Sequence, residues 1–125
     1  MKKVIVVEDN LLISTLYKHY LGKLDYKIIN VAITGEKAIE VLKTNEVDLI
    51  IMDIMLEGEI DGIEAMNEIR KETNTPVIFA SGNSDKYNHT RALEISDSLF
   101  LVKPVTESNF LKAVKKVEEE YKISS

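Results

Sequence analysis

The sequence predicts an α/β fold, namely a single doubly wound domain in which five strand–helix units build a parallel sheet with helices on both faces. Five short apolar runs rich in β-branched residues lack strong period-2 alternation, as is typical of strands covered on both faces. Stretches with helical spacing separate these runs, and this alternation implies right-handed crossovers between parallel strands. The chain has 125 residues and no repeat or linker, so we expect one domain over residues 1–125.

The apolar runs define the expected strands. In chain order these are Lys3–Val7, Lys27–Ala32, Val47–Asp53, Pro76–Ser81 and Ser98–Val102. Side chains that can accept hydrogen bonds from the free N–H groups of a helix start precede the first, second and fifth expected helices. These capping residues are Asn10, Thr34 and Thr106.

The helices are expected from apolar residues that share one helical face. The faces predicted to pack on the sheet are Leu12, Leu16 and Tyr20; Ala38, Val41 and Leu42; Ile63, Met66 and Ile69; and Phe110, Leu111, Val114 and Val117. The fourth helix, Lys86–Glu94, has the weakest pattern, because Ala92, Leu93 and Ile95 are its clear apolar residues.

Composition excludes several classes of protein. The formal net charge is −5, and the 16 Lys and Arg residues are scattered, which argues against direct nucleic-acid binding. There is no cysteine, so a disulfide scaffold, a thiol nucleophile and a Cys-ligated zinc are excluded. No stretch approaches the roughly 20 apolar residues of a membrane span. We expect a soluble, cytoplasmic protein that does not contact a membrane.

Polar side chains stand where the expected strands end. Glu8 and Asp9 follow the first strand, Asp53 ends the third, Ser81 ends the fourth, and Lys103 follows the fifth. Taken singly, each has an ordinary explanation as a helix cap or a solvated loop residue. Ligand sites of doubly wound sheets lie outside the carboxyl ends of the strands, so these five side chains together predict a site.

The chemistry of this set points to phosphoryl transfer. Three neighbouring carboxylates repel one another by about 4 kcal/mol per close pair at an effective dielectric near 20, and Lys103 offsets only part of that. An all-oxygen cluster without His or Cys favours Mg²⁺. Asp53, at the end of a buried strand, is the best candidate for a nucleophile that forms an aspartyl-phosphate, with Lys103 and Ser81 stabilising the phosphoryl oxygens.

These residues resemble the receiver domain of two-component response regulators, and the resemblance covers nearly the whole chain. The matching segments are "VVEDN" (6–10), "DLIIMDIMLEGEIDGIE" (48–64), "PVIFASGNSD" (76–85) and "LFLVKPV" (99–105). No single segment is very specific, but their order and spacing are. The resemblance implies a flavodoxin-like sheet with strand order 2-1-3-4-5.

The resemblance also implies a role for each matching residue. Asp53 would accept a phosphoryl group from a sensor histidine kinase or a phosphotransfer protein. Asp9 would bind Mg²⁺ directly and Glu8 often through water, while the backbone carbonyl of Met55 would complete the metal ligands.

The remaining matches imply how a signal would leave the site. Ser81 corresponds to the switch hydroxyl and Phe100 to the switch aromatic residue. Lys103 corresponds to the phosphate-binding lysine, with a cis peptide before Pro104. The surface formed by the fourth helix, the fifth strand and the fifth helix would then control a downstream partner or an output domain absent from this chain, with a homodimer through this surface as one possibility.

The sequence departs from the family pattern at several positions. The segment from Asp53 to Gly62 is one residue longer than in common receivers, which predicts a differently shaped loop. Ser96 replaces a frequent glycine. Two positions that tune water attack in the family hold Met55 and Asn83, and we hypothesise that Met55 favours a long-lived phosphoryl state.

Other functions are weighed against a signalling switch, which is not a conventional enzyme. An aspartate-nucleophile phosphatase or phosphotransferase would usually carry a second acid two residues after Asp53, where Met55 stands. A flavin-binding protein would have its phosphate repelled by Glu8 and Asp9. A pseudo-receiver that binds partners without phosphorylation stays an alternative. The segment "YKISS" after the fifth helix leaves open a stand-alone receiver or a fragment of a larger regulator or hybrid kinase.

Overall fold

The computed structural model describes residues 1–82 and 85–121, which form five strands and five helices in strict alternation. The strands are β1 (Lys2–Val7), β2 (Tyr26–Ala32), β3 (Leu49–Asp53), β4 (Val77–Gly82) and β5 (Ser98–Lys103). The helices are α1 (Leu11–Leu21), α2 (Gly35–Thr44), α3 (Gly62–Ile69), α4 (Lys86–Leu93) and α5 (Glu107–Glu120). In the described part of the chain, no helix is both long and apolar enough to cross a membrane.

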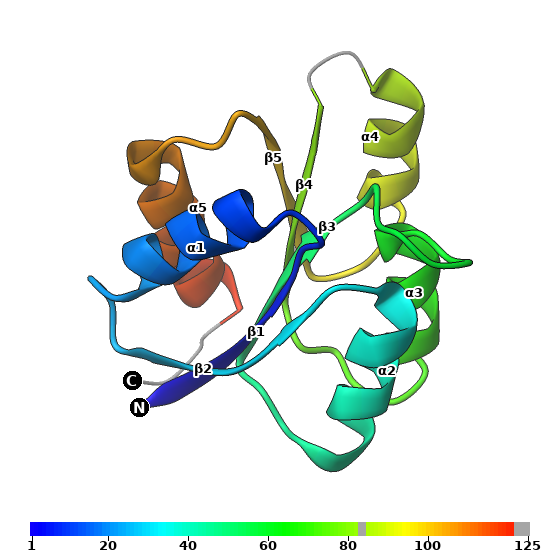
Figure 1. Ribbon diagram of the computed structural model, residues 1–125, viewed down its shortest axis with the longest axis horizontal. Helices are drawn as coiled ribbons and strands as arrows, with labels where there is room; N and C mark the ends of the chain where they lie inside the picture. Colours follow the sequence, from blue (N-terminus) through cyan, green and yellow to red (C-terminus); the bar gives the residue numbers. More distant parts are fainter. Residues whose placement is uncertain (83–84, 122–125) are drawn as a thin grey trace.

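All neighbouring strands pair in parallel, in the order β2-β1-β3-β4-β5. Helices α1 and α5 cover one face of the sheet, and α2, α3 and α4 cover the other (Figure 1). The predicted doubly wound sheet and its strand order are therefore confirmed. Strand order reverses at β1 and β3, and the crevice outside their carboxyl ends is the place where such sheets bind ligands.

The strands formed by the apolar runs differ in burial according to their place in the sheet. Every residue of β3 is buried, as are Val4–Val7 of β1 and Val77–Ser81 of β4, whereas the edge strands β2 and β5 are largely half-buried. The predicted strand bounds agree with the structure to within two residues. The central strands have apolar side chains on both faces because both faces are covered.

The predicted packing face of α1 is wrong. Leu12 and Leu16 are 71% and 41% exposed, and of the predicted residues only Tyr20 is buried. The helix instead turns Tyr17 inward, where its ring stacks on Phe110 of α5 at 5.2 Å between centroids. The buried face of α1 consists of Ser14, Tyr17, Tyr20 and Leu21, so two aromatic rings and the last leucine face the core in place of Leu12 and Leu16. The predicted faces of α2, α3 and α5 do pack on the sheet.

The helix starts are fixed by side-chain caps. The predicted caps Asn10, Thr34 and Thr106 each accept a hydrogen bond from the backbone N–H three residues later. Asp61 and Asp85 do the same for α3 and α4. Each helix follows the carboxyl end of a strand, so the chain enters all five helices from the edge of the sheet where the predicted site lies.

The turn before β5 carries Ser96 at the position where glycine is frequent, and the next residue takes up the left-handed backbone conformation. Asp97, which follows Ser96, adopts a left-handed φ of 53°. The guanidinium of Arg70 donates hydrogen bonds to the carbonyl oxygens of Ser96 and Asp97 at 2.7 Å and 3.1 Å. Aspartate tolerates this conformation better than most residues, and the two hydrogen bonds help to hold it.

Candidate functional site

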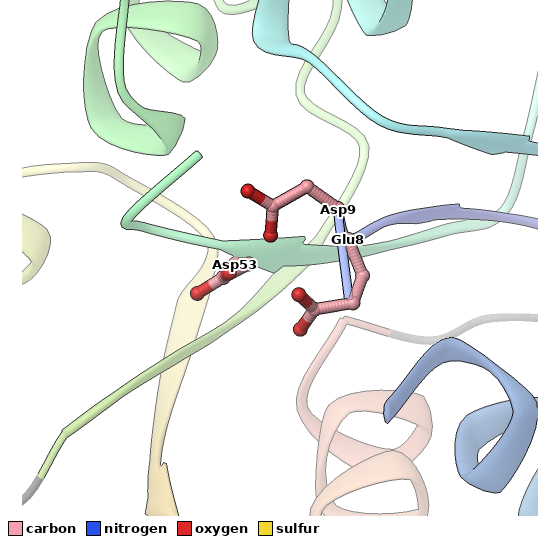
Figure 2. A group of neighbouring side chains, drawn as sticks. All are labelled: Glu8, Asp9 and Asp53. Carbon is pink, nitrogen blue, oxygen red and sulfur yellow. The ribbon is translucent and has the colours of Figure 1, made fainter. Parts of the chain in front are cut away.

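The predicted acidic residues meet at the carboxyl edge of the sheet. Glu8 and Asp9 follow β1, and Asp53 is the last residue of β3, the neighbouring strand. One carboxylate oxygen from each of the three lies within 4.8 Å of the others. Figure 2 shows the three side chains grouped where the two strands end. The parallel register alone brings them together, because Val7 pairs with Met52 and the next residues follow at the same level.

Lys103 reaches this cluster from the end of β5. Its Nζ lies 3.2 Å from Oε1 of Glu8 and 3.1 Å from Oδ1 of Asp53. Both carboxylate side chains are buried, with 1% and 3% of their surface exposed. The peptide bond between Lys103 and Pro104 is cis. The ammonium at the end of an apolar strand therefore points at two buried anions rather than into solvent.

The cluster carries more negative charge than Lys103 neutralises. Burial, followed by the charge of Asp53, raises the pKa of Glu8 from 4.5 to about 7. Burial also raises the pKa of Asp53, against the opposing effect of Lys103. Burial disfavours the charged form of Lys103, but the carboxylates of Asp53 and Glu8 outweigh it and raise the pKa of the ammonium. These shifts show a site that is short of positive charge.

The donor set fits a hard divalent cation. Glu8, Asp9 and Asp53 offer oxygen ligands alone, which suit Mg²⁺ better than zinc or copper. Oδ1 of Asp53 is buried and accepts no hydrogen bond from the described residues, although the Lys103 ammonium lies at ion-pair distance. A cation bound by these carboxylate oxygens would supply the missing positive charge.

Asp9 is held by the loop between β3 and α3. Its Oδ2 accepts a hydrogen bond from the backbone N–H of Glu57 at 3.1 Å. The same loop is anchored on α2, because Glu36 accepts from the N–H of Glu59 at 3.0 Å. Gly58 lies between these two contacts with a φ of 101°, a conformation that favours glycine. The segment with the additional residue thus folds back onto the acidic cluster.

A second glycine permits close packing behind Asp53. A Cβ added at Gly62 would lie 2.2 Å from the carbonyl oxygen of Asp53. The N–H of Gly62 donates to the carbonyl oxygen of Ile54 at 2.8 Å. The absence of a side chain therefore lets the first turn of α3 press against the backbone that carries the candidate nucleophile.

Ser81 lies at the same edge but turns away from the carboxylates. Its Oγ donates a hydrogen bond to Oδ2 of Asp85, the N-cap of α4, at 3.2 Å. Within the described residues this is the hydrogen bond that the Ser81 hydroxyl makes. The structure therefore places Ser81 beside Asp53 in the sheet, where Asp53 pairs with Ala80, but engages its hydroxyl elsewhere.

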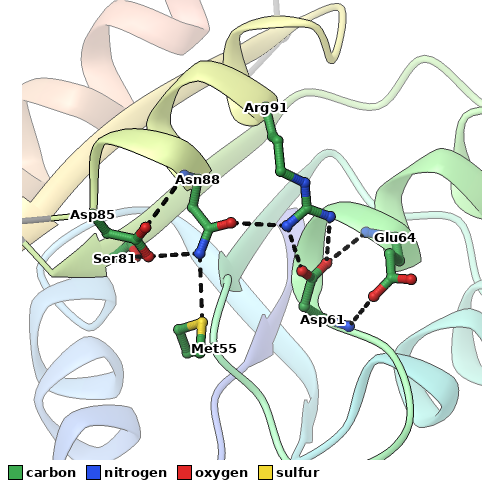
Figure 3. A network of polar contacts seen from close by, with 7 residues as sticks. All are labelled: Met55, Asp61, Glu64, Ser81, Asp85, Asn88 and Arg91. Carbon is green, nitrogen blue, oxygen red and sulfur yellow. Dashed lines mark hydrogen bonds and ion pairs between the residues drawn. The ribbon is translucent and has the colours of Figure 1, made fainter.

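A polar network that the sequence did not predict surrounds Ser81 (Figure 3). Asn88 of α4 donates to Oδ2 of Asp85 and accepts from Nη1 of Arg91 at 2.8 Å. Arg91 also pairs with Asp61, the cap of α3, at 2.6 Å. The start of α4 could have been found from Asp85, which is a typical capping residue before a helix.

Phe100 and Met55 are the remaining predicted residues in the described structure. Phe100 is half-buried in β5, and the ring of His89 from α4 stacks on it with 4.3 Å between centroids. The side chain of Met55 is 62% exposed, and its Sδ lies 3.5 Å from Nδ2 of Asn88. Asn83 lies outside the described residues. The roles of these residues in switching, metal binding and hydrolysis stay predictions.

Comparison with known families matches residues 4–115 to the response regulator receiver domain. The match extends over most of the chain and includes all the acidic residues of the site. The protein belongs to the response regulator receiver domain family. Members of this family generally act as signalling switches rather than as conventional enzymes.

Individual proteins support the assignment. The chain is 33% identical over 105 residues to the uncharacterized transcriptional regulatory protein YrkP of Bacillus subtilis, a match that covers 84% of this chain and 44% of that protein. The chain spans less than half the length of the curated relatives it matches. The activities of those whole proteins therefore do not follow for this chain.

Solved structures show the same fold. The signal receiver domain of a modulated diguanylate cyclase from Desulfovibrio desulfuricans G20 superimposes with a TM-score of 0.86 at 27% identity, covering 98% of this chain and 97% of that one. The receiver domain of the sensor histidine kinase PA1611 from Pseudomonas aeruginosa PAO1 has a TM-score of 0.81 at 24% identity, covering 92% and 95%. That structure holds a magnesium ion coordinated in its active-site cleft.

Proposed function

We propose that this receiver domain, extending over residues 1–125, is a phosphorylation-dependent switch of a two-component phosphorelay, with Asp53 as the phosphoacceptor. The observation that carries the proposal is the position of Lys103, whose ammonium lies within 3.2 Å of Glu8 and 3.1 Å of Asp53 in a cluster of three carboxylates. A structural ion pair needs one acid for one lysine. Three acids that share one lysine leave negative charge without a partner, and a bound cation would neutralise it beside the phosphoryl group.

The transfer step uses the chain's own groups in a simple order. A carboxylate oxygen of Asp53 attacks the phosphorus of a phosphohistidine on a sensor histidine kinase or a phosphotransfer protein, and a new O–P bond forms. The P–N bond breaks, and the imidazole nitrogen keeps the electron pair and takes up a proton. Lys103 stabilises the negative oxygens that pass between the two proteins.

Glu8, Asp9 and Asp53 would hold Mg²⁺, with the backbone carbonyl of Met55 as a further ligand. When bound, the ion neutralises the acidic cluster and the phosphoryl oxygens. The hydrogen bond from Glu57 N–H to Asp9 fixes one oxygen of that carboxylate and so orients the other. The alternative of a phosphatase lacks support, because the position two residues after Asp53 carries Met55 instead of an acid.

The phosphoryl group would change the surface formed by α4, β5 and α5. Its oxygens would attract the hydroxyl of Ser81, and Phe100 would turn toward the space that Ser81 leaves. This surface would control a downstream partner or an output domain, and it is the surface for a homodimer if one forms. The curated relatives that are transcriptional regulators make an output on gene expression a fitting proposal, without direct nucleic-acid contact by this domain. The switch would act in the cytoplasm together with its kinase partner.

The test is the formation of an acyl phosphate. The protein is incubated with acetyl phosphate and Mg²⁺, and the intact mass is measured with and without a chelator. The expected result is the added mass of one phosphoryl group that requires Mg²⁺ and disappears in the Asp53→Asn variant. An unchanged mass in the parent protein, or the same adduct in Asp53→Asn, would overturn the proposal.

A further inference from the structure

The Ser81 hydroxyl is already engaged in the resting structure. Ser81 is buried, with 1% of its surface exposed, and its Oγ donates to Oδ2 of Asp85 at 3.2 Å. Asp85 uses its other oxygen to cap α4, by accepting from the backbone N–H of Asn88 at 3.2 Å. One carboxylate therefore holds both the start of α4 and the hydroxyl at the end of β4.

The carboxylate of Asp85 is fixed from the other side. The side-chain amide of Asn88, which is buried, donates to the same Oδ2 that Ser81 contacts. This hydrogen bond is the main reason that the pKa of Asp85 lies below its ordinary value. The amide oxygen of Asn88 accepts from Arg91, which pairs with Asp61 at 2.6 Å (Figure 3). A continuous chain of charge-assisted contacts thus links Ser81 to the start of α3.

We propose that Asp85 is a positioning residue that withholds the Ser81 hydroxyl from the phosphoryl group on Asp53. This inference rests on the proposed function. A serine hydroxyl has one proton to donate, so its hydrogen bond to Asp85 and a hydrogen bond to a phosphoryl oxygen exclude each other. The hydroxyl must therefore leave Asp85 before it can donate to a phosphoryl oxygen. Because Asp85 caps α4, the loss of this contact changes the N-terminus of α4.

This competition sets how strongly the switch favours its resting state. When the phosphoryl group binds Ser81, the hydrogen bond from Ser81 to the ionised Asp85 carboxylate must break. Such a bond is stronger than one between neutral groups. Removing the acceptor oxygen of Asp85 should therefore raise the affinity for a phosphoryl mimic without any change to the residues that touch the mimic. The expected gain in affinity is about three- to tenfold, because the Ser81 hydroxyl no longer has to break its hydrogen bond to Asp85 when the mimic binds.

The test uses beryllofluoride as the phosphoryl mimic and the Asp85→Ser variant. A serine at this position keeps the cap of α4, since its oxygen accepts from the N–H of residue 88, but it removes the charged carboxylate and the Oδ2 atom to which Ser81 donates. The bound fraction is followed by ¹⁹F NMR at saturating Mg²⁺. We expect the dissociation constant to fall about three- to tenfold, while the affinity for Mg²⁺ alone stays that of the parent.

The matched control is the same substitution in the Ser81→Ala background. If Asp85 acts through the Ser81 proton, Asp85→Ser changes nothing there, whereas a general loss of negative charge or of helix stability would still act. An equal gain in both backgrounds, or no gain in the parent background, would overturn the inference. Asp85→Asn replaces Asp85→Ser if circular dichroism shows that helix is lost, because its amide oxygen caps and its NH₂ donates to Ser81.

The same experiment separates this inference from the proposed function. Absence of any bound ¹⁹F signal that depends on Asp53 would overturn the proposed function and the role of Asp85 with it. Binding to the parent with an unchanged constant in Asp85→Ser would overturn only the role of Asp85.

Discussion

Glu8 and Asp53 are buried carboxylates that share one ammonium. Lys103 lies 3.2 Å and 3.1 Å from them, and Asp9 adds a third negative charge at the same place. Burial removes the water that would stabilise these charges, so a proton or a metal ion must take its place. In metal-free protein the proton fulfils this role, and the pKa of about 7 for Glu8 follows from it.

The stability of the metal-free protein should fall as the pH rises from about 5 to about 7. The folded protein keeps a proton on Glu8 up to a pKa of about 7, whereas the unfolded chain releases it near 4.5. The folded state binds more protons than the unfolded chain in this interval. The stabilisation is therefore complete below the pKa of the unfolded chain and disappears as the pH rises through the pKa of the folded protein. Urea unfolding in a chelator, followed by circular dichroism across this pH range, measures the effect.

Glu8→Gln is the control for this prediction. The amide does not titrate, so the variant should lose less stability over the same interval, and the remaining loss reports Asp53, whose pKa is raised in the same direction. A fall of equal size in the parent and in Glu8→Gln would show that Glu8 does not hold the proton.

The elements around the site are placed by close backbone contacts. The first turn of α3 lies against the end of β3, where Gly62 leaves no room for a side chain beside the carbonyl oxygen of Asp53. The caps Asp61 and Asp85 fix where α3 and α4 begin, and Arg91 ties the two helices together. The geometry of Asp53 therefore depends on residues outside the acidic cluster.

Gly62→Ala should destabilise the protein by about 1–3 kcal/mol, because the new Cβ has no space and the strand or the helix must shift. The added atom would lie 2.2 Å from Asp53 O and 2.8 Å from Met52 Cγ. Gly82→Ala is the matched control, since a Cβ at that position meets nothing within 4 Å. Chemical denaturation of both variants tests this. Equal stability of the two variants would contradict the packing described for α3.

The buried face of α1 could not be predicted from the sequence. Residues 11–21 are apolar on more than one side, so several faces fit the helical spacing equally well. The choice is made by tertiary contacts, above all the stacking of Tyr17 on Phe110. The sequence pattern predicts that α1 is a helix, but it does not show which face of the helix packs on the core.

The whole molecule brings residues from four strands to one edge of the sheet. This arrangement could be predicted, because parallel strands that alternate with helices all present their carboxyl ends on the same side. Glu8, Asp53, Ser81 and Lys103 each stand at such an end. Their assembly needs no knowledge of side-chain contacts.

The contacts between helices could not be predicted in the same way. Arg91 and Asp61 are 30 residues apart, and each is an ordinary surface residue in the sequence. Whether Ser81 faces Asp53 or Asp85 depends on a single side-chain torsion, which no periodicity encodes. The sequence thus indicates which groups reach the site, and the structure shows how they are engaged at rest.

The most direct measurement is a crystal structure of the protein with Mg²⁺ and beryllofluoride. We expect beryllium bonded to a carboxylate oxygen of Asp53, Mg²⁺ bound among Glu8, Asp9 and Asp53, Lys103 in contact with one fluoride, and Ser81 turned from Asp85 toward another fluoride. Beryllofluoride absent from Asp53, or Lys103 and the three carboxylates apart from one another in that crystal, would contradict it.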